Sequence, residues 1–316
     1  MRVAILDDYQ RVALSMADWP SIGAGVSVHP FHDRLGSEDH IAERLRNFDV
    51  IVAMRERTPL PATLIERLPL LKLIVTTGRR NAAIDVKAAA ARGVVVSGTS
   101  TLSQPPVELT WGLILALARS IPRESAGMRD GGWQSTMGVG LHGKTLGVVG
   151  LGRLGTEVAR IGQAFGMDVI AWSQNLTREK TDAAGVELVA KDALFQRADV
   201  VTVHLVLGER TRGIIGEREL SLMKPGAFLV NTARGPIVDE HELIHALRHS
   251  VIAGAALDVF DEEPLPADHP LRRLPNTVIT PHLGYVTRET YRIFYGQSLE
   301  DVEAYLRGAP VRVVKP

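Results

Sequence analysis

One segment, "GKTLGVVGLGRLGTEVARIGQAFGMDVIAWS" at residues 143–173, limits the possible folds more than any other part of the chain. An apolar run enters a turn containing Gly150, Gly152 and Gly155, a segment with helical apolar spacing follows, and a second apolar run closes the unit. Strand, glycine turn, helix and strand in this order seat a pyrophosphate at a helix N-terminus. The alternative is a glycine-rich turn that binds no ligand, and the flanking strand and helix make it the weaker interpretation.

Strands and helices alternate along the rest of the chain. Apolar runs at 2–8, 48–54, 71–78 and 94–99 are typical of buried strands, and segments 60–69 and 86–93 of helices. Residues 105–130 are largely helical in pattern, and Pro122 should kink or divide that helix. This alternation predicts an α/β protein whose parallel sheets are covered by helices on both faces.

Composition excludes several classes of protein. A chain of 316 residues is too long for one ordinary core, so two domains are expected. Lys and Arg together number 36, as do Asp and Glu, which gives no electrostatic reason to expect nucleic acid or an anionic membrane as a partner. The absence of cysteine excludes disulfides and thiolate chemistry. No signal peptide or membrane-spanning run is apparent, and we expect a cytoplasmic location.

Four later apolar runs each end in a polar residue: His204, Arg234, Asp258 and His282. Ligands of open parallel sheets bind outside the carboxyl ends of the strands, so these side chains should converge near the cofactor. Taken singly, Arg234 could form a surface salt bridge and His282 could be a structural histidine. Their shared placement at strand ends weakens both alternatives. No cluster has the spacing of metal ligands, so no metal is expected.

The chain resembles the D-isomer-specific 2-hydroxyacid dehydrogenases. The resemblance is dense through the glycine turn, "TRGIIG", "MKPGAFLVNTARGPIVDEHELIHAL", "ALDVFDEEPL" and "TPHLG", and looser over the first hundred residues. It implies a Rossmann dinucleotide-binding domain at 103–285 and a smaller flavodoxin-like substrate domain formed by 1–102 plus 286–316. It also implies hydride transfer between NAD or NADP and a small 2-keto or 2-hydroxy acid in a cleft between the domains.

The resemblance also implies which residues form the site. It identifies Glu263 as the acid that hydrogen-bonds the catalytic His282, and Arg234 as the third catalytic residue. Asp261 and Glu262 are then solvated. The expected cofactor contacts are Gly150, Gly152, Arg153, Leu154, Gly155, Ser173, Gln174, Asn175, His204, Thr232, Ala233, Arg234, Asp258, His282 and Gly284.

Physical chemistry supports these roles independently. Reduction of a 2-keto acid needs a hydride donor, a proton donor for the developing alkoxide and a cation for the carboxylate. Histidine suits the proton step because its ordinary pKa lies near neutrality, and a neighbouring carboxylate steadies the imidazolium. Arginine suits the carboxylate because its planar fork binds two oxygens at once. Gly235 beside Arg234 should let that loop lie close to a ligand.

The substrate remains open at this level. Arg55, Gly78, Arg79, Arg80 and Arg234 are the candidate contacts. The backbone N–H groups of Gly78 and Arg79 could hold a carboxylate. Arg80 stands where the family pattern has a second glycine, and the two adjacent arginines either face a second anionic group of the substrate or point to solvent.

The second strand of the glycine-turn unit predicts the cofactor preference. An NAD site usually ends this strand in Asp or Glu, which bonds the ribose 2′-OH and repels a 2′-phosphate. Here Ser173, Gln174 and Asn175 follow the strand, with Arg178 and Lys180 soon after. We expect a site that accepts both cofactors, with NADP(H) bound at least comparably to NAD(H). The alternative is an ordinary NAD site in which Ser173 bonds the ribose.

The functional class and the oligomeric state each have an alternative interpretation. The C-terminal-binding corepressors share these residues yet act as nicotinamide-sensing binding proteins, so a binding function is the alternative. Alanine dehydrogenases and adenosylhomocysteine hydrolases are disfavoured by "NTARG" and "DVFDEEP". Because relatives are usually dimers, a homodimer is expected. The helix from Pro105, with Trp111, either forms that contact or packs within one subunit.

Overall fold

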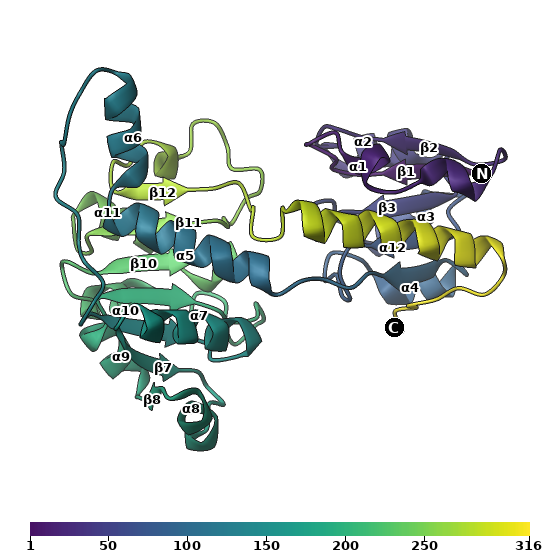
Figure 1. The fold of residues 1–316 in the computed structure, drawn as a ribbon. Coiled ribbons are helices and arrows are strands. Elements are labelled where there is room, and N and C mark those ends of the chain that lie inside the picture. The colour runs from purple at the N-terminus through teal and green to yellow at the C-terminus, as the bar shows by residue number, and fades with distance from the viewer. The chain divides into compact units, whose positions relative to one another are not determined.

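The computed structural model describes residues 1–316, which form two compact units. Unit 1 comprises residues 1–102 and 287–316, and unit 2 comprises 103–286. Each unit is a parallel sheet with helices on both faces (Figure 1). The α/β class with two doubly wound sheets, predicted from the alternating pattern, is confirmed.

Unit 1 has a five-stranded sheet in the order β2-β1-β3-β4-β5, the flavodoxin-like arrangement. Its strands are β1 (Arg2–Ile5), β2 (Ser27–Pro30), β3 (Val50–Ala53), β4 (Leu73–Thr76) and β5 (Val95–Gly98). Its helices are α1 (Ala13–Met16), η1 (Trp19–Ile22), α2 (Glu38–Leu45), α3 (Ala62–Glu66), α4 (Val86–Ala91) and α12 (Arg288–Leu306). The two central strands β3 and β4 are buried along their whole length, as unbroken apolar strands of a covered sheet should be.

Unit 2 has a seven-stranded sheet in the order β12-β11-β10-β9-β6-β7-β8, with every pair parallel. Its strands are β6 (Thr145–Val149), β7 (Asp168–Trp172), β8 (Glu187–Leu188), β9 (Val200–Val203), β10 (Phe228–Asn231), β11 (Gly254–Leu257) and β12 (Thr277–Ile279). Its helices are α5 (Gln104–Ala118), α6 (Ile121–Arg129), α7 (Arg153–Ala164), α8 (Arg178–Ala184), α9 (Lys191–Arg197), α10 (Glu217–Leu222), η2 (Gly235–Ile237), α11 (Glu240–Arg248) and η3 (Pro270–Arg272). The strand order reverses between β6 and β9, which is where doubly wound sheets bind ligands.

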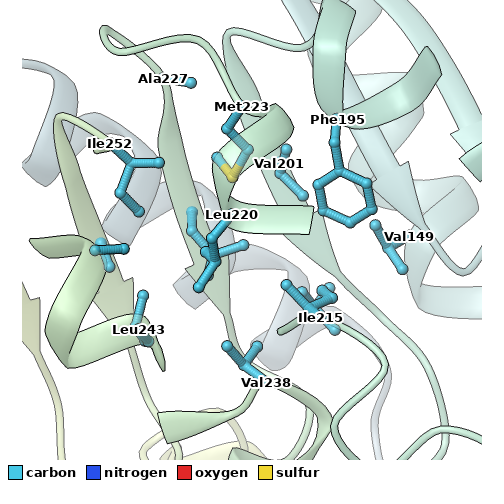
Figure 2. Packing of buried hydrophobic residues seen from close by; sticks show 14 of the residues in the cluster. Val149, Phe195, Val201, Ile215, Leu220, Met223, Ala227, Val238, Leu243 and Ile252 are labelled. Carbon is cyan, nitrogen blue, oxygen red and sulfur yellow. The ribbon is translucent and has the colours of Figure 1, made fainter. Parts of the chain in front are cut away.

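Alternate residues of β6 serve the two cores of unit 2. Val149 packs with α9, α10 and α11 on one face, where Phe195 and Leu220 are also buried (Figure 2). Val148 packs on the other face with α5 and α7. Because the strand is buried from both sides, its carboxyl end is held firmly at the point where the glycine turn begins.

The long helical segment predicted at 105–130 is divided, as expected. Helix α5 ends at Ala118, Ser120 takes a left-handed φ of +50°, and α6 begins with Pro122 in its first turn. Trp111 on α5 is only 5% exposed, stacks on Phe165 at 4.8 Å between ring centroids, and packs within unit 2. Trp111 is therefore a core residue of unit 2, and a subunit contact through this helix stays a prediction. No helix has the length and apolar character needed to cross a bilayer.

Candidate active site

The glycine turn joins β6 to α7, and the surroundings of its three glycines differ. Gly150 has a φ of +103°, and a Cβ there would lie 2.8 Å from the backbone of His204. A Cβ on Gly155 would lie 2.1 Å from the carbonyl oxygen of Gly150, so only glycine permits this packing of helix on strand. A Cβ on Gly152 would meet nothing within 4 Å. The space beside Gly152 is thus open to a ligand.

The first turn of α7 provides the means of holding that ligand. Gly152 is the N-cap, and no side chain caps the helix. The first backbone N–H groups, including those of Arg153 and Leu154, therefore lack an intrahelical partner, and they lie at the positive end of a 12-residue helix dipole. This arrangement fits the pyrophosphate of a dinucleotide.

The turn after β7 carries no acid. Ser173 is half-buried, and Gln174 and Asn175 are exposed. The amide Nε2 of Gln174 donates a hydrogen bond to the carbonyl oxygen of Arg210 at 3.2 Å, which ties this turn to the loop after β9. This turn should lie beside the ribose of a bound dinucleotide, and it lacks the carboxylate that would repel a 2′-phosphate.

Three adjacent strands deliver the remaining candidate residues to one edge of the sheet. In the β10–β11–β12 register, Asn231 pairs with Leu257 and Leu257 with Ile279. Arg234, Asp258 and His282 follow these strand ends within a few residues. The shared edge predicted from the sequence is thus present in unit 2.

Glu263 and His282 form a close pair. Glu263 Oε2 lies 2.6 Å from His282 Nδ1, and the N–H of Phe260 donates to Glu263 Oε1 at 3.0 Å. Burial would raise the pKa of Glu263, but its hydrogen bonds with His282 and Phe260 and the nearby charge of Arg234 hold the pKa below the ordinary value. Glu263 is therefore ionised and accepts a hydrogen bond from the Nδ1–H group, which leaves Nε2 of His282 as the nitrogen that can exchange a proton with a ligand.

Asp258 shapes the backbone on which His282 lies. It is fully buried and accepts three hydrogen bonds: from Thr280 Oγ1 at 2.6 Å, the Leu283 N–H at 2.7 Å and the Gly284 N–H at 2.8 Å. His282 has a φ of +53°, a conformation that L residues adopt only when their surroundings impose it. Asp258 fixes the residues on both sides of His282, although burial raises the pKa of this carboxyl.

Arg234 owes its position to close backbone packing. A Cβ on Gly235 would lie 2.1 Å from the carbonyl carbon of Phe260, so Gly235 brings the Arg234 loop against the segment that leads to Glu263. Gly235 thus has a structural reason in this chain's own backbone, and the close approach of the Arg234 loop to a ligand stays a prediction. Asn231 holds the turn by donating from Nδ2 to the Arg234 carbonyl at 2.9 Å.

The neighbouring candidates contribute differently. Ala233 is half-buried, and Thr232 Oγ1 lies 2.8 Å from Thr110 Oγ1 on α5. His204 Nε2 lies 2.9 Å from Thr202 Oγ1, and burial lowers the pKa of His204 to about 4. A histidine with a lowered pKa carries a donatable proton less often near neutral pH than one paired with a carboxylate, so His282 is the first candidate for the acid and His204 the second.

The substrate candidates of unit 1 surround Gly78. Gly78 has a φ of +99°, and a Cβ there would lie 1.9 Å from Nη1 of Arg55, whose guanidinium occupies that space. The Gly78 N–H already donates to Thr99 Oγ1 at 2.8 Å. The expectation that this N–H could hold a carboxylate is therefore wrong. Arg79 and Arg80 are both exposed.

Several polar side chains that hold loops by hydrogen bonds are not marked by any sequence pattern described above. They are the polar side chains that hold the two sets of loops: Asn231 and Thr280 in unit 2, and Thr77, Asn81 and Thr99 in unit 1. Asn231 is the exception, because a polar residue at the end of a buried apolar run is itself a signal.

The segment between Asp258 and His282 contains further acids and a second histidine. Asp261 and Glu262 are exposed, and His269 pairs with Glu240 at 3.1 Å. These residues therefore lie outside the Glu263–His282 pair.

Comparisons with known proteins agree with this geometry. Residues 111–284 match the family model described as "D-isomer specific 2-hydroxyacid dehydrogenase, NAD binding domain". The chain is 41% identical to a D-3-phosphoglycerate dehydrogenase of Methanocaldococcus jannaschii over 86% of its own length and 52% of the relative's. It is 42% identical to a glyoxylate reductase of Aeropyrum pernix over 78% of its own length and 76% of the relative's. The chain thus spans only about half of the first of these relatives.

Solved structures give the same result. A phosphoglycerate oxidoreductase from Vibrio cholerae O395 aligns with a TM-score of 0.93 and 37% identity, over 98% of this chain and all of the other. An acyclic imino acid reductase, solved with NADPH and D-Arg, aligns with a TM-score of 0.76 and 27% identity over the full length of both chains.

Fold and site together define an α/β protein with an NAD-binding domain and a paired histidine and carboxylate at the strand edge of that domain. The chain belongs to the family of D-isomer-specific 2-hydroxyacid dehydrogenases. The findings favour this enzyme class over a corepressor-like binding protein on the same fold.

Proposed function

We propose that this protein transfers a hydride between NAD(P)(H) and a small 2-keto or 2-hydroxy acid of D configuration. The observation that carries the proposal is the 2.6 Å contact between Glu263 and His282 at the strand edge, with Arg234 close enough to lower the pKa of Glu263. A paired histidine and carboxylate, an arginine, and an open helix N-terminus at the same edge of the sheet supply the groups that the reaction needs.

Each residue has one task in the reduction. The bound nicotinamide supplies the hydride. His282 donates a proton from Nε2 to the carbonyl oxygen as negative charge develops there. Glu263 holds the ring in the tautomer that leaves Nε2 free for the substrate and stabilises the imidazolium. Arg234 binds the substrate carboxylate through its planar fork and remains charged throughout.

Unit 1 is proposed as the substrate domain and unit 2 as the dinucleotide domain. Arg55, Arg79 and Arg80 are the proposed substrate contacts in unit 1. Arg79 and Arg80 are exposed, and none of the hydrogen bonds or ion pairs of the structure involves their side chains. Two such cations favour a substrate with a second anionic group over lactate or glyoxylate.

The cofactor site is proposed to accept both NADP(H) and NAD(H), with the phosphorylated form bound at least comparably. The acid-free turn at Ser173 supports this, as does the imino acid reductase solved with NADPH. The ratio of catalytic efficiencies for NADPH and NADH with one shared keto acid tests it. A preference for NADH above about a hundredfold, equal to ~2.7 kcal/mol, contradicts it.

The protein is further proposed to be a cytoplasmic homodimer. Large apolar side chains are exposed on α6 and the segment that follows it: Ile121, Met128, Trp133, Met137 and Val139. Trp133 is 75% exposed and Met137 is 96% exposed, which is unusual for a surface that meets only water. A second copy of the chain is the occupant that the family's habit of dimerisation suggests.

The enzymatic proposal is tested by following cofactor absorbance at 340 nm over a panel of 2-keto acids, including glyoxylate, hydroxypyruvate, pyruvate and phosphohydroxypyruvate. We expect turnover of about 1–1,000 per second with at least one of them. Nicotinamide binding without turnover on any member of the panel contradicts the proposal and supports the corepressor-like alternative.

A further inference from the structure

The loop between β9 and α10 is joined to the turn that follows β7. Gln174, the residue after Ser173, donates from Nε2 to the Arg210 carbonyl oxygen at 3.2 Å. Arg210 thereby lies beside the turn where a ribose 2′ substituent is expected. It is distant in sequence from the glycine turn, and local motifs give no hint of this proximity.

The loop that carries Arg210 has a defined shape. Thr211 Oγ1 donates to the Val206 carbonyl oxygen at 2.7 Å and accepts from the Gly208 N–H at 2.8 Å. The N–H groups of Thr211 and Arg212 both donate to the Gly208 carbonyl oxygen at 3.0 Å. Arg210 therefore projects from a hydrogen-bonded turn, and little conformational freedom of the backbone would be lost on binding a ligand.

The other candidate cations of unit 2 either lie close to an acid or have no hydrogen bond to this turn. Lys191 is held by Glu219 at 2.7 Å. Arg212 lies near Asp261, where its charge opposes the rise in pKa that burial and the neighbouring Glu240 cause in that acid. Arg178 begins α8 and is exposed, but no hydrogen bond joins it to the Ser173 turn. Arg210 is exposed, and its guanidinium has no ion pair.

We propose that Arg210 is the residue that recognises the 2′-phosphate of NADP(H). The inference rests on the proposed cofactor site at the glycine turn and adds to it the source of selectivity. The guanidinium binds two phosphate oxygens, and the turn after β7 contributes no carboxylate that would repel the phosphate. The cation that distinguishes NADP(H) from NAD(H) thus comes from the loop after β9. It does not come from the turn after β7, where such a residue is usually found.

Binding of two nucleotides to the full-length protein tests this without any turnover. Adenosine 2′,5′-bisphosphate and adenosine 5′-monophosphate differ only in the 2′-phosphate, so their affinity ratio, measured by calorimetry at low salt, reports that group alone. We expect the bisphosphate to bind about tenfold or more tightly in the wild type, the usual effect of a charge-assisted contact. Arg210→Ala should bring the ratio close to one and leave the monophosphate affinity unchanged.

Two further variants and the remaining outcomes complete the design. Arg178→Ala, the rival cation, and Arg129→Ala, an exposed arginine at the end of α6, should keep the wild-type ratio. Helices α6 and α8 lie at opposite ends of unit 2, so Arg129 is a remote control (Figure 1). A ratio retained in Arg210→Ala, or lost in Arg178→Ala, overturns the assignment. Failure of both nucleotides to bind overturns the cofactor site itself, whereas a low wild-type ratio overturns only the role of Arg210.

Discussion

Two carboxylates flank His282 and act on it in different ways. Glu263 reaches the imidazole ring directly at 2.6 Å, and its pKa is held below the ordinary value. Asp258 accepts hydrogen bonds from the Thr280 hydroxyl and from the N–H groups of Leu283 and Gly284, and it is fully buried, with a pKa raised by that burial. Glu263 therefore orients the ring by direct contact, whereas Asp258 holds the backbone segment that carries the ring.

Replacement of the proton donor should affect turnover and spare cofactor binding. We expect His282→Ala to lower the turnover number by roughly 10²–10⁴, because a positioned proton donor is usually worth that much. Steady-state kinetics at saturating keto acid, with NADH affinity from fluorescence titration, provide the measurement. His241→Ala, on the exposed first turn of α11, is the matched control. Near wild-type turnover in His282→Ala would show that another group supplies the proton.

Removal of the paired carboxylate should move the pH profile. Glu263 is ionised across the working range because its pKa is lowered, so it favours the imidazolium of His282 at every such pH. In Glu263→Gln the imidazolium gives up its proton more readily, and keto-acid reduction should fall away at lower pH than in the wild type. Profiles of kcat/KM from pH 5 to 10 test this. Glu262→Gln, at the exposed neighbouring residue, should leave the profile in place, and an unmoved profile in Glu263→Gln contradicts the pairing.

At the scale of elements, the β6–turn–α7 unit separates packing from ligand binding. Gly155 is required by the contact of helix with turn, because a Cβ there meets the Gly150 carbonyl oxygen at 2.1 Å. Gly152 has no such neighbour, and its φ of −87° is accessible to any residue. The two glycines of one motif therefore have separable functions.

Two alanine substitutions test this separation. Gly155→Ala should lower the free energy of unfolding by about 1–3 kcal/mol, the usual cost of overpacking. Gly152→Ala should leave unfolding nearly unchanged while weakening NADH binding about tenfold or more, because the methyl group occupies the space of the pyrophosphate. Urea denaturation and fluorescence titration of both variants give the two quantities. Equal loss of stability in both would contradict the assignment of roles.

How much of this was predictable depends on whether the cause is local. The glycine turn, the division of α5 from α6 and the strand ends that carry Arg234, Asp258 and His282 follow from short-range patterns, and the structure has them. The blocked N–H of Gly78 depends on Thr99, and the reason for Gly235 depends on the backbone of Phe260. Such contacts join segments distant in sequence, and apolar periodicity carries no information about them.

At the scale of the whole molecule, the apolar surface on α6 and residues 133–139 predicts self-association. Trp133→Glu places a charge in the proposed interface and should convert a dimer of 34.4 kDa chains into monomers. Size-exclusion chromatography with light scattering measures the mass. Leu14→Glu, at a 52% exposed residue of α1, is the control and should leave the dimer intact. A monomeric wild type contradicts the proposal directly.

Unit 1 is assembled from two stretches that are separated in sequence by all of unit 2. Its C-terminal stretch contributes the fully buried Phe294 and Tyr295 of α12, and Val314 donates its N–H to the Val96 carbonyl oxygen at 2.8 Å. On the ribosome, residues 1–102 must therefore wait for the intervening 103–286 to be made, roughly ten to forty seconds at ordinary rates of synthesis. The apolar surface of unit 1 that Phe294 and Tyr295 cover therefore stays exposed to solvent during that interval.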